Sequence, residues 1–443
     1  MAESRNCLPT NSRAETIAVI GGGIAGLASA HFLTSAGKRV TLFESSDRFG
    51  GLGTFFSYRD KFFERFYHCM LPGDNDLMGL LSDLQIDQHV YWRPSTFGYI
   101  NNGTIHGLNT PAELLRFSPL PFADRLRVGF TGLYGSAVSG RGLDDTTAVE
   151  WLTRLSGRRA FQMFWKPMLQ AKFGSGYHDV PALWFWTRFN REKGTKEEVK
   201  GYIRGGYKFI TDQIVSSLES RGCLLQKNTP VESLDLNDQG TPVITVGGEP
   251  LEFDKVIVTT PVETLRRIAG KKQLQKSLHP VDSSIDYQGV INVVLFMRRP
   301  LSNHYWIAAM NDGLPFQAIV ETSALLDPED TDGLHLVYLA KYLHRSHPEF
   351  AQSDEEIRNA YIGGLRGLIP YIKAEDIIEA QVFRAPFVEP LYRKGYLRLK
   401  PPEELIPRRV YLATSTQVYP SVTSWNSSTG LARQVVQSML QSD

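Results

Sequence analysis

Apolar and polar residues alternate with different periods along the chain, and the first change of period predicts a strand–helix–strand unit. A short, continuous apolar run at Ile17–Ile20 is typical of a buried parallel strand. Helical spacing follows over Leu27–Ser35, and a second apolar run covers Arg39–Phe43. This order predicts the start of a parallel, doubly wound α/β sheet.

A second region has the pattern of an antiparallel sheet. Asn102-Gly103 separates two short alternating runs and predicts a tight hairpin. Four β-rich runs follow later in the chain: Val290–Met297, Tyr305–Met310, Phe316–Glu321 and His335–Leu343. Sequential strands joined by tight turns favour an antiparallel sheet over further βαβ units.

Between these regions, Ala148–Asn190 is the most aromatic part of the chain, with large apolar residues at helical spacing. Pro167 is expected to kink or restart a helix there. One interpretation is a helical cap that packs its own core. Another is the wall of an apolar substrate cavity or a lip that faces a membrane. The two interpretations are compatible.

Composition narrows the class of protein. The chain has 443 residues, of which 42% are hydrophobic and 21% charged, an ordinary balance for a globular protein. Because its net charge is only +1, overall electrostatic attraction does not favour binding to nucleic acid. Three scattered cysteines indicate neither a disulfide framework nor a zinc site, and we expect no metal.

The first 15 residues are polar, without the apolar core of a secretory signal, and no run approaches about 18 apolar residues. We expect a cytoplasmic protein, with peripheral membrane contact left open.

The turn after the first strand carries the strongest chemical signal. Gly21, Gly23 and Gly26 have G-x-G-x-x-G spacing between a strand and a helix. The first glycine permits a tight turn, the second lets the backbone approach a pyrophosphate, and the third lets helix and strand pack closely. Glu44 ends the second strand, where a carboxylate accepts hydrogen bonds from ribose hydroxyls and repels a 2′-phosphate.

A second glycine-rich turn selects the cofactor. Asp47–Thr54 follows the ribose carboxylate at once and contributes Arg48, Gly50, Gly51, Leu52 and Thr54 as candidate binding residues. A nicotinamide site does not need this turn. The long ribityl-pyrophosphate arm of a flavin dinucleotide does, because it runs along further backbone N–H groups. We therefore expect FAD.

From Glu44 to Gly51 the chain resembles the E-x-x-x-R-x-G-G signature of the superfamily of flavin amine oxidases, protoporphyrinogen oxidases and phytoene desaturases. The stretches FERFYH, KPMLQAKFG and GYIRGGY are similar to a bacterial protoporphyrinogen-oxidase-like group of NAD(P)/FAD-dependent oxidoreductases, so the resemblance covers most of the chain. It implies backbone contact with adenine at Val231. It also implies flavin contacts at Ser415 and Thr423. Where most relatives carry an acid, just after the last strand, this chain has Thr414, Ser415 and Thr416.

The resemblance implies an α/β fold: a Rossmann-like FAD-binding domain in three segments and an α+β substrate domain with an antiparallel sheet and a helical cap. The FAD-binding segments are 16–70, 200–285 and 385–443, and the substrate segments are 71–199 and 286–384. Because no second G-x-G-x-x-G occurs, we expect no separate nicotinamide domain.

Three residues are candidates for catalysis. His68 falls where several relatives carry an aromatic–histidine pair, although a histidine among aromatics is often a packing residue. Lys172 lies in the aromatic segment and Lys341 on the last predicted β-rich run. A lysine whose pKa is lowered by apolar surroundings could act on a substrate, whereas simple snorkelling is the plainer interpretation.

The leading functional hypothesis is an FAD-dependent oxidoreductase that takes a hydride from a C–H bond of a mostly apolar small molecule. A rival is a redox-neutral isomerase resembling the UDP-galactopyranose mutases, although the chain lacks a dense arginine cluster for a nucleotide diphosphate. A third is a non-catalytic flavoprotein that binds a lipid or a partner. The sequence leaves the substrate, the electron acceptor, covalent attachment of FAD and the oligomeric state open.

Overall fold

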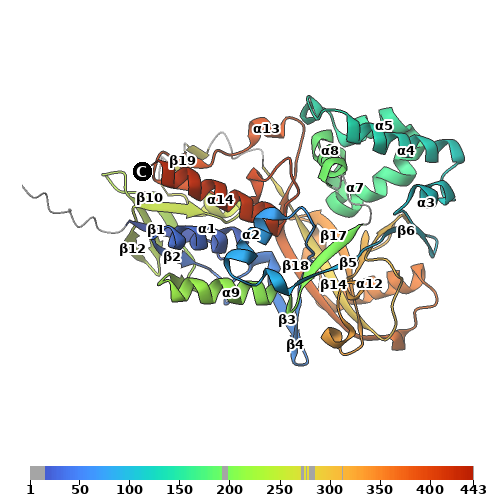
Figure 1. Cartoon of the computed structure of the whole chain (residues 1–443), viewed down its shortest axis with the longest axis horizontal. Coiled ribbons are helices and arrows are strands. Elements are labelled where there is room, and N and C mark those ends of the chain that lie inside the picture. The colour runs from blue at the N-terminus through green and yellow to red at the C-terminus, as the bar shows by residue number, and fades with distance from the viewer. Residues whose placement is uncertain are drawn as a thin grey trace, which may run out of the picture.

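Two large sheets organise the chain, one on each side of the molecule (Figure 1). A computed structural model describes residues 15–191, 198–270, 274–275, 277–278, 285–311 and 313–442. Residues 1–14, Cys7 among them, lie outside the described residues.

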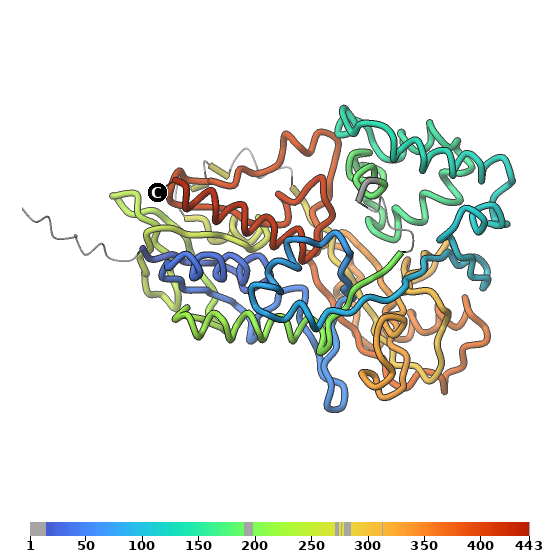
Figure 2. Tube along the Cα trace, in the orientation of Figure 1, coloured from blue at the N-terminus to red at the C-terminus, as the bar shows by residue number. Residues whose placement is uncertain are grey.

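The first sheet has six strands in the order β19-β20-β13-β1-β2-β9 and is parallel except for β19. Its strands come from three separated parts of the chain, which lie side by side in Figure 2. In chain order they are β1 (Thr16–Ile20), β2 (Arg39–Phe43), β9 (Leu224–Gln226), β13 (Lys255–Val258), β19 (Glu404–Ile406) and β20 (Val410–Leu412).

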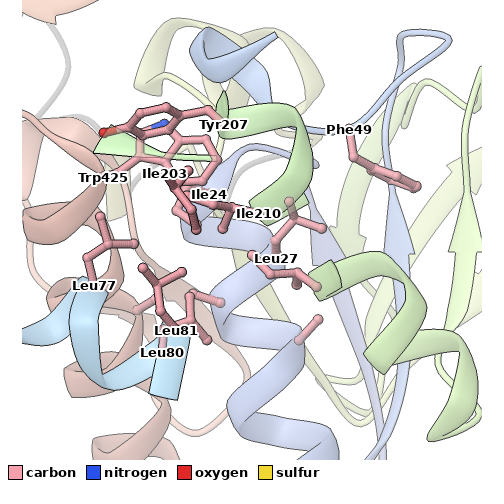
Figure 3. Packing of buried hydrophobic residues seen from close by; sticks show 14 of the residues in the cluster. Ile24, Leu27, Phe49, Leu77, Leu80, Leu81, Ile203, Tyr207, Ile210 and Trp425 are labelled. Carbon is pink, nitrogen blue, oxygen red and sulfur yellow. The ribbon is translucent and has the colours of Figure 1, made fainter. Parts of the chain in front are cut away.

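Helix α1 is the centre of packing on one face of this sheet (Figure 3). It places Ile24 and Leu27 against Leu77 and Leu80 of α2, Tyr207 of α9 and the N-terminus of α14. The helices around this sheet are α1 (Ile24–Ser35), α2 (Asn75–Asp83), α9 (Gly206–Ser220), α10 (Val262–Ile268), α13 (Tyr396–Leu399) and α14 (Trp425–Gln441). The opposite face packs on α10 and on an antiparallel meander of β10 (Ser233–Leu236), β11 (Pro242–Val246) and β12 (Glu249–Glu252).

The second sheet has seven strands in the order β18-β14-β17-β16-β15-β6-β7. One face packs on α12 (Asp354–Leu368), and the other faces the aromatic helices. The strands are β6 (Phe97–Asn101), β7 (Thr104–Gly107), β14 (Tyr287–Met297), β15 (Trp306–Ala309), β16 (Ala318–Glu321), β17 (His335–His344) and β18 (Ile377–Pro390). Two short antiparallel pairs complete the described strands: β3 (Phe55–Tyr58) with β4 (Lys61–Glu64), and β5 (Val90–Pro94) with β8 (Val199–Ile203).

A helical cap covers one end of the second sheet, at the end of the molecule far from the six-stranded sheet (Figure 1). Its helices are α3 (Pro111–Arg116), α4 (Phe122–Ala137), α5 (Ala148–Ser156), α6 (Arg158–Ala160), α7 (Lys166–Phe173) and α8 (Ala182–Arg191). A π-helical turn at Phe161–Trp165 joins α6 to α7 just before Pro167. The predicted restart of a helix at this proline is therefore present.

The predicted fold class is confirmed, with corrections in detail. The hairpin at Asn102-Gly103 is present, and both residues have positive φ angles, of 47° and 77°. The second sheet is not purely antiparallel, because β15 pairs with β6 in parallel. The strand β18 belongs to this sheet and runs to Pro390, beyond the boundary expected at 385. The division into domains stays a prediction.

Candidate functional site

One large cavity of about 1070 Å³ lies among the two sheets and the cap. Its wall begins at the glycine-rich turn after β1 and continues to the aromatic residues of the π-helical turn and α8. The predicted binding residues and the most aromatic segment thus face a single space.

The glycine-rich turn forms a cradle at one end of the cavity. Gly21 has a φ of 109°, which L side chains rarely adopt, and its N–H donates to the Phe43 carbonyl at 2.8 Å. Gly22 and Gly23 line the cavity, and Gly50 and Gly51 of the second turn lie directly opposite. Gly23 is the N-cap of α1 and offers no side-chain cap, so the first N–H groups of the helix are left for a ligand.

The carboxylate of Glu44 lies at the same end. Its Oε2 accepts the Gly22 N–H at 2.7 Å and its Oε1 accepts the Ser46 N–H at 2.8 Å. These two bonds fix the carboxylate against the turn, and Glu44 lines the cavity. The Ser45 hydroxyl also donates to Oε1 at 3.3 Å, so Oε2 is the oxygen that keeps a lone pair for a further donor, as the predicted contact with ribose hydroxyls requires.

Other predicted residues of the two turns support the cradle without lining it. Gly26 packs so closely on the first turn that a Cβ there would lie 1.8 Å from the Gly21 carbonyl oxygen. Arg48 pairs with Asp47 and donates from Nη1 to the Phe55 carbonyl at 3.2 Å, which ties the turn to β3. Thr54 follows the 3₁₀ turn at Gly51–Gly53 and does not reach the cavity wall, whereas Leu52 does.

The C-terminal loop closes the cradle from the opposite side. Ser415, Thr423 and Ser424 line the cavity, and Ser424 caps α14 by accepting the Ser427 N–H at 3.1 Å. Helix α14 begins at Trp425, earlier than the expected Leu431, and Trp425 packs against Gly53. Val231 lies apart from the cavity wall, against the hydrophobic cluster behind the sheet, so its predicted role stays untested.

The residues present fit a flavin dinucleotide. Thr260 Oγ1, at the end of β13, is buried in the cavity wall and has no hydrogen-bond partner among the described residues. A Cβ at Gly23 would come within 4 Å only of the Gly51 Cα, at 3.8 Å, so the cradle is open where a pyrophosphate would approach. The glycine turns, the helix N-terminus and Glu44 would hold the dinucleotide, and Ser415 and Thr423 lie along the continuing wall.

His68 lies where the cradle meets the rest of the cavity. Its ring contacts Tyr207 at a centroid distance of 4.8 Å and Trp425 at 6.3 Å. Burial lowers the pKa of His68 to about 4, so the ring is neutral near pH 7. Because Nδ1 lies 2.6 Å from the Phe66 carbonyl, which can only accept, Nδ1 carries the proton and Nε2 keeps its lone pair.

Lys172 also lines the cavity, where it is part of a buried polar cluster. Its Nζ lies 2.6 Å from Oε2 of the fully buried Glu389 and 5.3 Å from the centre of the Tyr342 ring. The Tyr342 hydroxyl is 3.1 Å from the Tyr67 hydroxyl. Burial raises the pKa of Tyr342 to about 12, so this phenol stays protonated near pH 7.

Lys341 is placed differently. Its neighbours Ala340 and Tyr342 belong to the cavity-side cluster, and side chains alternate along a strand. The side chain of Lys341 therefore points to the opposite face, where Nζ lies 2.5 Å from Glu349. The structure does not bring Lys341 to the cavity.

Aromatic side chains form most of the far wall. The π-helical turn, α8, β15 and β18 contribute Phe164, Trp165, Trp184, Phe185, Phe189, Trp306 and Phe387. Many of these residues also belong to the core of the cap, so both interpretations of the aromatic segment describe the same side chains. Trp184 Nε1 is buried without a partner among the described residues.

The sequence did not point to two polar residues of the wall. Glu389 follows a stretch of β18 with no recognisable motif. Asn292 lies inside an apolar run on β14, where its Nδ2 donates to the Arg65 carbonyl at 3.0 Å. Its Oδ1 has no partner among the described residues. The only sequence signal for Asn292 was its position as a polar residue within an otherwise apolar strand, where a buried polar group needs a partner.

The fold and the cradle define a dinucleotide-binding flavoprotein whose cavity continues from the cradle into a largely apolar space. The family model described as "Flavin containing amine oxidoreductase" matches residues 24–423, and the chain belongs to this family. The members of this family are described as flavin-containing oxidoreductases, and the cofactor of this chain is FAD.

The chain is similar to several known proteins of this kind. It is 22% identical over 329 residues to the 15-cis-phytoene desaturase of Narcissus pseudonarcissus, covering 67% of this chain and 56% of the desaturase. The chain thus matches little more than half the length of this relative. In fold it is similar to a putative protoporphyrinogen oxidase from Exiguobacterium sp. 255-15, with a TM-score of 0.75, 15% identity, and 97% and 99% of the two chains covered. It is also similar to reduced UDP-galactopyranose mutase, with a TM-score of 0.78, 17% identity, and 97% and 96% covered.

No helix in the described part of the chain is long and apolar enough to cross a membrane. The same residues contain no group of three or more histidine, cysteine, aspartate or glutamate side chains placed to hold a metal ion.

Proposed function

We propose that this chain takes a hydride from a C–H bond of a mostly apolar small molecule, leaving a C=C or C=N bond in the product. FAD, when bound, supplies the hydride acceptor. The observation that carries the proposal is the continuity of the cavity, because a substrate held by the aromatic wall has direct access to the end of the cradle marked by His68.

The aromatic wall supports an apolar substrate body. Trp165, Phe185 and Phe189 contact one another edge to face, at centroid distances from 5.3 to 6.1 Å. Such a wall excludes water and holds a hydrocarbon or ring system by burial of apolar surface. The arginines of the described cavity wall are Arg188 and Arg267, which do not form the cluster that a nucleotide diphosphate calls for.

The buried ion pair supports one polar group on that substrate. Lys172 binds Oε2 of Glu389, whereas Oε1 of Glu389 is buried and has no hydrogen-bond partner among the described residues. A buried carboxylate oxygen normally accepts a hydrogen bond from an N–H or O–H group. A hydroxyl or an amine on the substrate would satisfy it and would orient the apolar body.

His68 has a separate place in the proposal. Its neutral ring donates from Nδ1 to the Phe66 carbonyl, and its Nε2 offers a lone pair that accepts a hydrogen bond or a proton near pH 7. A proton lost from the atom next to the oxidised carbon has an acceptor in this ring.

The test is an anaerobic screen of the purified flavoprotein with amines, tetrapyrroles, polyene precursors and nucleotide sugars, followed by flavin absorbance. Bleaching by one class supports the proposal and identifies the substrate family. If no class bleaches the flavin and turnover appears only after dithionite reduction, the protein is a redox-neutral isomerase and the proposal is wrong.

Two lysine variants test where the substrate binds. Lys172→Met removes the partner of Glu389 in the cavity, and Lys341→Met removes an ion-paired lysine on the opposite face of the sheet. We expect Lys172→Met to change the rate of bleaching by the identified substrate at least about tenfold, since it leaves a buried charge unpaired. Lys341→Met should leave this rate near that of the parent. Equal effects of the two variants would argue against a substrate site at the ion pair.

A further inference from the structure

Helix α4 is turned so that its large apolar side chains face solvent. The residues that it buries are small or polar: Asp124, Val128, Thr131 and Gly135. The residues that it exposes are large and apolar: Phe122 (61% exposed), Leu126 (52%), Phe130 (58%) and Leu133 (75%). A helix on the surface of a water-soluble protein normally has the reverse arrangement.

The exposed residues form a single stripe. Their spacing of four, four and three places them on one face of the helix. Tyr134, at 40% exposure, stacks on Phe130 at a centroid distance of 5.9 Å, and Leu115 of α3 is also exposed. The stripe lies at the end of the molecule opposite the six-stranded sheet (Figure 1).

The buried face of α4 cannot exchange places with this stripe. A Cβ at Gly135 would already lie 2.7 Å from the Phe189 ring of α8, so the cap accepts only a very small residue there. Asp124 pairs with Arg127 at 3.1 Å and with Arg159 at 3.7 Å. The orientation of α4 is therefore fixed by its contacts with the cap, and the stripe is permanently outside.

The exposed charges near the stripe are basic, and the acid of α3, Glu113, is half-buried and accepts the Thr110 N–H at 3.0 Å. The acid of α4, Asp124, is buried, whereas its partners Arg127 and Arg159 are exposed. Arg116, in the last turn of α3, is exposed as well. A large apolar stripe with basic side chains beside it is the pattern of a helix that lies in the interface of an anionic membrane.

We propose that α4, together with the end of α3, docks this protein on an anionic lipid bilayer. The stripe would enter the boundary between head groups and acyl chains, while the arginines contact lipid phosphates. Phe189, which α4 covers at Gly135, lines the cavity, so docking would place one wall of the apolar cavity a single helix away from the lipid. The docking itself does not depend on the proposed reaction.

A second copy of the chain fits this surface less well. A helix of this length is about 24 Å long and presents a stripe about 10 Å wide, or about 240 Å². A stable dimer of standard size buries about 800 Å² on each partner.

The test is flotation of the full-length holoprotein with lipid vesicles. Vesicles of phosphatidylcholine alone are compared with vesicles rich in phosphatidylglycerol, each at low and high salt. We expect binding to the anionic vesicles that weakens with salt. The double variant Phe130→Ser/Leu133→Ser should lower the partition coefficient at least about 100-fold, because burial of each side chain contributes a factor of about ten or more.

A matched control is Leu224→Ser/Leu397→Ser, which removes two exposed leucines outside the cap (59% and 48% exposed) and should bind vesicles like the parent protein. Both double variants should keep the flavin spectrum and thermal midpoint of the parent. The proposal is overturned if the parent does not float with anionic vesicles, or if the two double variants lose binding equally. A dimer in light scattering that Phe130→Ser/Leu133→Ser dissolves, without vesicle binding, would assign the stripe to a second copy instead.

Discussion

At the scale of single residues, Gly23 and Gly26 have different tasks within one motif. A methyl group on Gly26 would overlap the Gly21 carbonyl, whereas a methyl group on Gly23 would meet no protein atom closer than 3.8 Å. Gly23 also has a φ of −72°, which alanine adopts without strain. Gly26 thus serves the protein's own packing, and Gly23 keeps the cradle open.

We therefore expect Gly23→Ala to fold with a thermal midpoint near that of the parent apoprotein but to bind FAD at least about 100-fold more weakly, because the methyl group occupies the cradle. Gly26→Ala should fail to fold or lose several kcal/mol of stability, as overpacked sites do. Titration with FAD and thermal melts of both apoproteins measure this. Tight FAD binding by Gly23→Ala would place the dinucleotide elsewhere.

His68 makes a second prediction at this scale. Since burial lowers its pKa to about 4, the ring stays neutral between pH 5.5 and 8. The rate of anaerobic flavin reduction by the identified substrate should therefore show no step near pH 6.5 that disappears in His68→Asn. Stopped-flow rates across this range check it, and a step that vanishes in the variant would show that His68 titrates in the working protein.

Some residues of the cavity wall could be predicted from the sequence alone, and others could not. Gly21, Gly23 and Glu44 could be predicted because their task depends on backbone shape over a short stretch. Glu389 could not, since its partner Lys172 is distant in the chain and only tertiary packing brings them to 2.6 Å. Lys341 does not reach the cavity because successive side chains of a strand point to opposite faces of the sheet, and the strand register decides which face each residue takes.

At the scale of elements, the end of β16 contains a buried acid. Glu321 accepts the Ser302 N–H at 2.9 Å, and His335 on β17 lies 3.8 Å away. Burial outweighs these hydrogen bonds and raises the pKa of Glu321 from 4.5 to about 7. The folded protein therefore holds this proton more tightly than the unfolded chain.

The raised pKa of Glu321 makes the folded protein more stable at low pH than at neutral pH. The contribution of Glu321 is fully present below about pH 4.5 and is lost as the pH rises to about 7, with a total of about 3 kcal/mol. We expect the free energy of unfolding to fall less steeply between pH 5 and 7 in Glu321→Gln, whose amide cannot ionise. Urea titrations at several pH values measure both slopes. Identical slopes in the variant and the parent would contradict the raised pKa.

Elements with a strong local pattern were predictable. The strands β14, β16 and β17 and the helix α12 agree with their apolar periodicity, and Ser353 caps α12 with Glu356 as a capping box. The first turns of α14 were missed, since the polar stretch after Trp425 has little helical pattern and is fixed by the cap at Ser424. The strand β18 was missed because its place depends on pairing with β14.

At the scale of the whole molecule, the cradle depends on three segments that are far apart in sequence. The turn after β1, the end of β13 and the C-terminal loop meet only when the six-stranded sheet is complete (Figure 2). The glycine-rich turns and the resemblance at Ser415 and Thr423 pointed to the first and the last of these segments, but no motif predicts that one cavity joins them to the aromatic cap. That continuity depends on how the two sheets face each other.

A ligand that touches all three segments should therefore stabilise them as one unit. Free FAD at about 100 times its dissociation constant adds about 2.7 kcal/mol to the free energy of unfolding if it binds only the folded chain. We expect added FAD to raise the thermal midpoint of the apoprotein and to slow amide exchange together in α1, at Thr259–Thr260 and at the start of α14. Exchange in α12, on the far face of the second sheet, should change only through the gain in global stability. Gly23→Ala is the control, because the same FAD concentration should add at most about 0.4 kcal/mol to its free energy of unfolding and shift its midpoint and exchange far less. Protection confined to α1 would mean that the C-terminal loop does not take part in binding, and the assignment of Ser415 and Thr423 would fall with it.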